Sequence, residues 1–454
     1  MKKTAARILF AATTLSVLSS CGGGGGSGGA SSGGDPNANF NCDGGCPNQA
    51  LSADDVATIL RQAVTAANNL GTPGTFSVVD RTGNVLALYQ MAGAPLTTII
   101  DGQTGAAGPL EGLAVPSTLA AISKAGTGAY LSSQGNAFST RTAGQIIQEN
   151  YLPGQRQQPG GPLFGVQFSQ LICSDVTRAN GATGPRPLPL GLSADPGGFP
   201  LYKQGDLVGG VGVEFDGLYT IDPDLQNYDG NPEESVALSA SVGFEAPAQR
   251  VGDNISLAGR SLRYADTSYS QIEVPTDLAE LDPASFKSQP SYTSGGIRAG
   301  TTFGTGPSGI VNTIKAGVPA AVVAGRYPTT GGRGLPGGEQ LSAGEVNALL
   351  DSALLTAHRS RAAIRTPRDT PARVSIFVVD SFGNPLGFIR SQDAPVFGID
   401  VALQKGRTAV FMSSPDAGTA LSSSGLGAYA SSFAAFTGTS LDGSHALSSR
   451  AVGN

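Results

Sequence analysis

Two strands joined by a glycine turn are encoded in the segment Phe76-Ser77-Val78-Val79-Asp80-Arg81-Thr82-Gly83-Asn84-Val85-Leu86-Ala87-Leu88. Its β-branched and aromatic residues favour strands, and the Gly-Asn pair favours a turn between them. The same pattern recurs as Ile376-Phe377-Val378-Val379-Asp380-Ser381-Phe382-Gly383-Asn384-Pro385-Leu386-Gly387-Phe388. We therefore predict two copies of one structural unit.

Matching blocks flank the strands in both copies. Ser52 and Asp55 form a capping-box pattern ahead of apolar residues at helical spacing, which predicts a helix. The segment Leu341-Ser342-Ala343-Gly344-Glu345-Val346 repeats this design. After the strands, residues 124–133 match residues 405–414. Three blocks in the same order indicate a duplication.

Only the first copy continues into Gly197-Gly198-Phe199-Pro200-Leu201-Tyr202-Lys203, a strand over Leu207–Val213 and a helix over Glu233–Phe244. The second copy stops before the equivalent positions. Either the sequence is a fragment of a longer chain, or this copy lacks its last strands, in which case an unpaired sheet edge would need a partner. The apolar stretch Val318–Val323 between the copies either caps a domain or belongs to a loop. We predict a first domain over 48–250, a loop-rich connecting segment over 251–339, and a second, C-terminally incomplete domain over 340–454.

The first residues have the pattern of an export signal. Basic residues precede the apolar run Ile8–Leu18, and Leu18-Ser19-Ser20-Cys21 is typical of a lipobox. Roughly eleven residues of helix cover about 16 Å, which is too short to cross a bilayer. We expect a signal peptide over 1–20, a lipidated Cys21 that anchors the chain to a membrane, and a Gly/Ser-rich tether over 21–47. An ordinary secretory signal is the alternative.

The expected location is the outer membrane, with the chain facing the periplasm or the cell surface. Gly22 rather than an aspartate follows the lipidated cysteine, and by resemblance to Gram-negative lipoproteins this favours the outer membrane. Such a compartment permits disulfides. We predict one between Cys173 and either Cys42 or Cys46, with a small Cys42–Cys46 loop as the alternative.

Composition excludes one class of partner. Charged residues make up 14% of the chain and the net charge is −6, so no basic stripe is present to bind nucleic acid. The 65 glycines and 29 prolines predict many turns and long loops.

The ordered motifs resemble a known family. A helix, Val-Val-Asp with a Gly-Asn turn, Ala-Pro, Lys-x-x-Thr, Gly-Gly-Phe-Pro-Leu-Tyr and a glycine-rich strand are similar to the GlcG/HbpS-like family of haem-binding or haem-degrading proteins. The resemblance covers most of residues 50–247 and the first part of 340–454. It implies a profilin-like α+β fold, with an antiparallel sheet flanked by helices in tandem copies. It also implies frequent homo-oligomers and, as ligand, haem or another small organic molecule.

Four residues at matching positions of the two copies are candidate ligand contacts. Lys124 and Lys405 could pair with a ligand carboxylate as point charges, with a solvated lysine as the alternative. Thr127 and Thr408 follow three residues later, on the same face of a helix, and could donate a hydrogen bond to the same ligand.

Further ligand candidates lie on the strands and beside them. Asp80 and Asp380, where a strand meets its turn, either accept turn amides or contact a ligand. Gly210 lies in a glycine-rich strand that lets a flat ligand or, as we favour, a neighbouring helix approach closely. Tyr130 is a candidate for contact with the ligand.

Iron ligation is the hardest requirement for haem. The chain has two histidines, His358 and His445, both in the second copy. His358 is a weak candidate for the haem iron, with a partly exposed surface histidine as the alternative. In the first copy Tyr130, Tyr89 or Met91 would have to serve, or haem would bind without a strong protein ligand.

An oxygen-rich loop could hold calcium, although turn chemistry also explains its residues and their spacing is not that of an EF-hand. The loop contains Asp222, Asp224, Asn227, Asp229 and Asn231.

The leading hypothesis is an envelope lipoprotein that captures or sequesters haem or a similar planar, carboxylate-bearing ligand. The alternative is a structural or assembly lipoprotein that uses the same fold as a non-catalytic scaffold or protein-interaction module. No catalytic set of residues is evident, so the sequence leaves enzymatic activity undecided and leans against it.

Overall fold

The computed structural model describes residues 49–102, 110–148, 160–175, 184–222, 224, 227–257, 259–274, 276–333 and 339–449. All of them belong to the unit Asp35–Asn454. The predicted signal peptide, Cys21 and the tether lie outside the described residues. None of the described helices is both long and apolar enough to cross a membrane.

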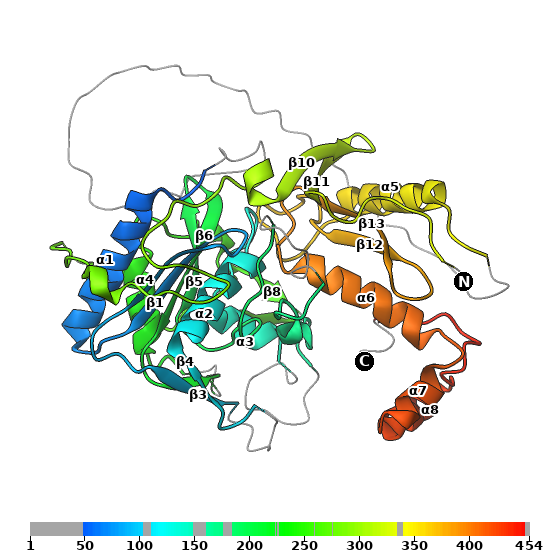
Figure 1. The fold of residues 1–454 in the computed structure, drawn as a ribbon, viewed down its shortest axis with the longest axis horizontal. Helices are drawn as coiled ribbons and strands as arrows, with labels where there is room; N and C mark the ends of the chain where they lie inside the picture. The colour runs from blue at the N-terminus through cyan, green and yellow to red at the C-terminus, as the bar shows by residue number, and fades with distance from the viewer. Residues whose placement is uncertain are drawn as a thin grey trace, which may run out of the picture. The chain divides into compact units, whose positions relative to one another are not determined.

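The first copy is built on a four-stranded antiparallel sheet in the order β2-β1-β6-β5. Helices α1 and α4 cover one face of this sheet and α2 covers the other (Figure 1). A small sheet in the order β4-β3-β7 lies in the same part of the chain. The elements are α1 (Ala53–Leu70), β1 (Thr75–Asp80), β2 (Val85–Gln90), β3 (Thr97–Asp101), β4 (Ala114–Pro116), α2 (Ser117–Leu131), α3 (Thr140–Ile146), β5 (Gly198–Lys203), β6 (Asp206–Glu214), β7 (Leu218–Thr220) and α4 (Pro232–Ala240).

Local chemistry explains where α1 begins and ends. Ser52 accepts a hydrogen bond from the Asp55 amide at 3.1 Å, and the Asp55 side chain accepts one from the Ser52 amide at 2.8 Å. This reciprocal pair satisfies two amides that the helix itself leaves free. Gly71 then ends the helix with a φ of 69°, a left-handed conformation that glycine adopts without a Cβ penalty.

The second copy repeats the helix, the strand pair and the following helix. Its sheet has the order β10-β11-β13-β12, with α5 on one face and α6 on the other (Figure 1). Its elements are α5 (Ala343–Arg359), β12 (Ser375–Val379), β13 (Pro385–Ser391), α6 (Gly398–Met412), α7 (Ala417–Ser423) and α8 (Gly427–Thr437). In the first copy β6 pairs with β1, whereas in the described part of the second copy β12 pairs only with β13.

The segment between the copies contributes to both sheets. The amides of Lys287 and Arg298 each donate at 2.9 Å to carbonyls of β2, so this segment covers the outer edge of the first sheet. The stretch Val318–Val323 is neither a cap nor a loop, which corrects the expectation: it is strand β11, which pairs with β10 and β13. The elements here are β8 (Ser256–Leu257), β9 (Arg260–Ser261), β10 (Ile310–Lys315) and β11 (Val318–Val323).

The predicted α+β class, with antiparallel sheets flanked by helices, is therefore confirmed.

Candidate functional site

Lys124, the leading ligand candidate of the first copy, lies at the centre of a buried ion cluster. Its Nζ is 2.7 Å from Asp195, 2.9 Å from Glu214 and 2.5 Å from Glu233. These carboxylates come from the loop before β5, the end of β6 and the start of α4. The Lys124 side chain is 0% exposed. The cluster therefore ties α2 to three separate parts of the first copy.

The cluster holds three carboxylates around one ammonium group, so its charges balance only when protons are bound. Burial by itself would lower the pKa of Lys124, but the three carboxylates raise it well above its usual value. Burial raises the pKa of Glu233 to about 8, despite the opposing effect of Lys124. The pKa of Asp195 is raised by burial as well. Buried charges are tolerated when they are paired in this way.

The other candidates along α2 also have partners within the chain. Thr127 Oγ1 donates to the Ser123 carbonyl at 2.8 Å and accepts from the Ser193 amide at 2.7 Å. Tyr130 is buried, and its hydroxyl lies 2.8 Å from the Thr82 carbonyl. The structure thus brings Lys124, Thr127 and Tyr130 onto one buried helix, and binding of a ligand by them stays a prediction.

The two strand-end aspartates hold their turns in the same way. Asp80 Oδ1 accepts from the amides of Thr82 at 2.9 Å and Asn84 at 3.0 Å. Asp380 Oδ1 accepts from the amides of Phe382 and Asn384, both at 2.9 Å. Both aspartates therefore accept turn amides, which is one of the two roles considered for them, and contact with a ligand stays a prediction.

Gly210 makes room for a helix. A Cβ on Gly210 would lie 2.2 Å from the Ala125 carbonyl oxygen of α2. Helix packing, the favoured interpretation of the glycine-rich strand, is what the structure contains at this position.

The equivalent helix of the second copy is much more open. Lys405 is exposed and Thr408 is half-buried. The described residues of this copy include no counterpart of β5, β6 or α4. Helices α7 and α8 follow α6 instead, and an open pocket of about 490 Å³ forms there.

The wall of this pocket is mostly apolar. We name it the α6–α8 pocket, and it is lined by Gln404, Arg407, Thr408, Phe411, Met412, Leu421, Leu426 and Tyr429. Its volume falls in the range of small-molecule sites, about 300–1,000 Å³. Arg407, which also lines the pocket, pairs with Asp175 and donates from Nε to the Gly383 carbonyl at 3.0 Å. Thr408 is thus the one predicted ligand residue among those that line it.

The candidates for iron ligation are scattered. His358 is half-buried near the end of α5, which covers the sheet face opposite α6, so His358 is separated from the α6–α8 pocket. His445 is exposed and lies 2.9 Å from the Ser444 hydroxyl. In the first copy the Tyr89 hydroxyl accepts from the Asp282 amide at 3.0 Å, and Met91 Sδ accepts from the Gly74 amide at 3.4 Å.

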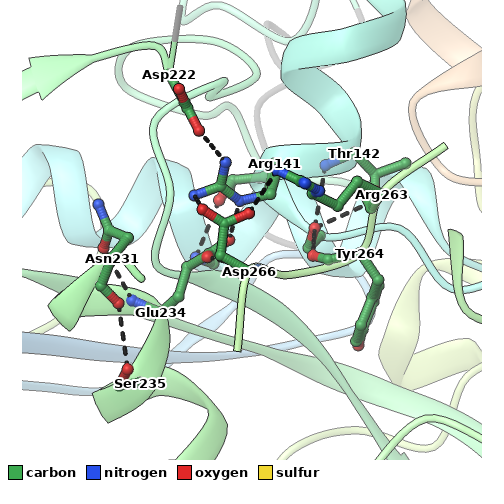
Figure 2. Close-up of polar contacts among 12 residues, drawn as sticks. Arg141, Thr142, Asp222, Asn231, Glu234, Ser235, Arg263, Tyr264 and Asp266 are labelled. Atoms are coloured by element: carbon green, nitrogen blue, oxygen red, sulfur yellow. Dashed lines mark hydrogen bonds and ion pairs between the residues drawn. The ribbon is translucent and has the colours of Figure 1, made fainter. Parts of the chain in front are cut away.

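The loop considered for calcium contributes instead to an arginine network. Arg141 of α3 lies 2.6 Å from Glu234 and 3.1 Å from Asp266, and it also pairs with Asp222 of the loop. Figure 2 shows these carboxylates arranged around the guanidinium. Oxygens of Asp222, Asp229 and Asp266 lie within 4.8 Å of one another. The guanidinium supplies positive charge there, and calcium binding stays a prediction.

Sequence reasoning missed the partners of Lys124. A useful indication was the lone lysine in the helix Ser117–Leu131, which is otherwise uncharged and rich in small residues. Such a helix can be buried on all sides, and a buried lysine needs carboxylates. Glu214, at the end of the apolar strand Leu207–Val213, was the natural candidate.

The predicted disulfide stays a prediction. Cys173 carries an exposed thiol with no disulfide partner among the described residues, and Cys42 and Cys46 lie outside them.

Fold and site together define an α+β protein in which a helix, a strand pair and a second helix occur twice. The second of these helices is buried in the first copy and lines the α6–α8 pocket in the second. Residues 51–100 match the family model described as "Haem degrading protein HbpS-like". The predicted family resemblance is thereby confirmed over this part of the first copy.

Three solved structures are similar to parts of this chain. The match to the PduOC:heme complex has 21% sequence identity and a TM-score of 0.27, and it covers 43% of this chain and 96% of the PduOC chain. Klebsiella pneumoniae protein ORFY is 20% identical, with coverages of 42% and 88% and a TM-score of 0.25. A double mutant of Streptomyces reticuli HbpS is 19% identical, with coverages of 44% and 90% and a TM-score of 0.23. The comparison with curated proteins gave no match.

Proposed function

We propose that this chain is an envelope-anchored lipoprotein that binds haem, or a similar planar and carboxylate-bearing molecule, for capture or sequestration. The observation that carries the proposal is the α6–α8 pocket on the helix of the second copy that contains Lys405 and Thr408. The family match over residues 51–100 supports a haem-related ligand.

The residues of the pocket fit such a ligand chemically. Phe411, Leu421 and Leu426 offer an apolar wall for the faces of a macrocycle. Met412 and Tyr429 are residue types that serve as axial ligands of haem iron in other proteins. Bound haem would supply a redox-active iron, while the chain would bind, orient and shield the macrocycle.

Titration of the soluble chain with hemin tests the proposal. We expect a saturable shift of the Soret band, and binding at least tenfold weaker in Phe411→Ala, because a buried aromatic contact often contributes more than about 1.4 kcal/mol. Phe436→Ala is the matched control, since Phe436 of α8 is 80% exposed and does not line the pocket. Absence of a saturable shift, or equal weakening in both variants, would overturn the proposal.

A variant of His358 tests whether haem binds in the α6–α8 pocket or elsewhere. Because α5 lies on the opposite sheet face, His358→Ala should leave the Soret spectrum of the complex unchanged. A changed spectrum would place the ligand away from α6–α8.

Membrane anchoring is tested independently by fractionation of cells. The chain with Cys21→Ser should move from the membrane to the soluble fraction, because the lipid would no longer be attached. A chain that stays soluble with Cys21 intact would contradict the anchor.

A second candidate function is a non-catalytic scaffold that assembles through β12. This strand pairs only with β13 in the described part of the sheet, and its residues Ser375–Val379 carry no charge. An uncharged sheet edge can pair with a further strand. In a symmetric dimer, two molecules of this protein would pair through the same β12 edge. A strictly monomeric chain in light scattering and cross-linking would contradict this function.

A further inference from the structure

Arg390 of β13 occupies a position that a neutral residue fills in the first copy. Gln90 pairs with Thr75 in the register of β1 and β2, and Arg390 pairs with Ser375 in the register of β12 and β13. Both side chains reach the loop that follows their strand: Gln90 Nε2 lies 3.4 Å from the Pro95 carbonyl, and Arg390 Nη2 donates to the Ala394 carbonyl. The second copy therefore buries a cation where the first copy buries an amide.

The charge of Arg390 lacks a direct partner. Its side chain is fully buried, and neither Nε nor Nη1 has a hydrogen-bond acceptor among the described residues. Burial and the nearby Arg81 together lower the pKa of Arg390 to about 9, against the opposing effect of Asp393. Arginine nevertheless remains charged in proteins, so the uncompensated charge is costly.

The nearest carboxylate is already in use. Asp393 Oδ1 accepts from Arg81 Nη2 at 2.7 Å, and Asp393 Oδ2 accepts from Arg365 Nη2 at 2.7 Å. Asp393 therefore pairs with two of the three buried arginines at the contact between the copies, and Arg390 is left without a carboxylate of its own. Asp206 and Arg250 also interact electrostatically with these groups. Their own charges have opposite signs, so the net positive charge of the cluster is unchanged.

The neighbouring arginines also have unpaired donors, and an aromatic ring lies against Arg81 and Arg390. The Nε atoms of Arg81 and Arg365 also lack acceptors among the described residues. The Phe303 ring has Arg81 Cζ at 3.9 Å and Arg390 Cζ at 5.5 Å from its centroid. The ring attracts both cations but carries no net charge that could neutralise them.

We propose that a small inorganic anion of the halide class binds between Arg390 and Arg81 at the contact between the two copies. The unused N–H groups of the two guanidinium groups are its donors. A single spherical ion suits this site, since Arg390 is 0% and Arg81 3% exposed. A larger oxyanion would bring several oxygens, each of which needs a donor in a buried setting.

Thermal unfolding of the full chain in sodium chloride and in sodium gluconate, at matched ionic strength, tests the proposal. Above its Kd, each tenfold increase in chloride should lower the unfolding equilibrium constant about tenfold, because the ion binds only the folded state. Arg390→Gln, which installs the residue of the first copy, should abolish the difference between the salts. Arg359→Gln, on an exposed arginine of α5, should keep the wild-type difference.

Crystals soaked in bromide provide a readout that does not depend on the variants. We expect an anomalous peak within hydrogen-bond distance of Arg390 Nε or Nη1. Coincident unfolding curves in the two salts, a chloride effect that persists in Arg390→Gln, or a bromide-soaked crystal without this peak would each overturn the proposal. If Arg390→Gln does not fold, the proposal is tested on the wild-type chain alone, by comparing its unfolding in the two salts and by the bromide peak. None of these measurements depends on hemin, so the site stands or falls separately from the proposed function.

Discussion

Lys124→Met removes the only ammonium group from the buried cluster while keeping a side chain of similar length. Three carboxylates would then share a site that is closed to water, with Asp195 2% and Glu214 0% exposed. Removal of one partner from a buried ion pair costs about 3–5 kcal/mol, out of a total stability of roughly 5–15 kcal/mol. We expect a loss of this size and a midpoint of thermal unfolding lower by on the order of 10 °C.

The assay is urea or thermal unfolding of the full chain, with Lys315→Met as matched control. Lys315 pairs with Asp351 at 2.8 Å, but these side chains are 24% and 32% exposed. Such a surface pair contributes about 0–1 kcal/mol. A loss below about 1 kcal/mol in Lys124→Met, or one equal to that of the control, would refute the reasoning.

The pH dependence of the Lys124→Met variant distinguishes lost charge pairing from lost packing. Without the ammonium group the cluster carboxylates bind protons more readily in the folded state than in the unfolded state. The deficit of the variant should therefore shrink as the pH falls. A deficit that is independent of pH would contradict the electrostatic explanation, and low pH also offers a condition in which a variant that fails to fold at neutral pH should recover.

Three further predictions concern the same framework. The pKa of Glu233 rises from 4.5 to about 8 on folding, so stability should fall as the pH rises through this range, and Glu233→Gln should flatten the dependence measured by urea unfolding. Gly210→Ala places a Cβ 2.2 Å from a main-chain oxygen of α2 and should lower the unfolding free energy by about 1–3 kcal/mol or more. In the control Gly306→Ala the Cβ meets nothing within 4 Å, so the unfolding free energy should change by less than about 0.5 kcal/mol. Asp393→Asn leaves two buried arginines without a carboxylate and should cost about 3–5 kcal/mol in calorimetry; an unchanged midpoint would contradict its role between the copies.

The sequence determined the elements whose causes are local. The capping box of Ser52 and Asp55, the glycine turn after Asp80 and the alternation of the following strand depend on residues a few positions apart. The duplication was visible for the same reason, since each copy repeats these local patterns. The α+β class was implied by the resemblance of these ordered patterns to the GlcG/HbpS-like family.

Tertiary structure alone decided the surroundings of the candidate residues. Lys124 and Lys405 have matching neighbours in sequence, yet one lies in a buried cluster and the other is exposed. Glu233 is 109 residues from Lys124, and Asp393 is 312 residues from Arg81. Pairs at such separations form only after the sheets bring the strands and helices together, because no local preference encodes them. The proposed lipid anchor rests on Cys21 and its neighbours in sequence, whereas the pocket and the buried arginines depend on the fold.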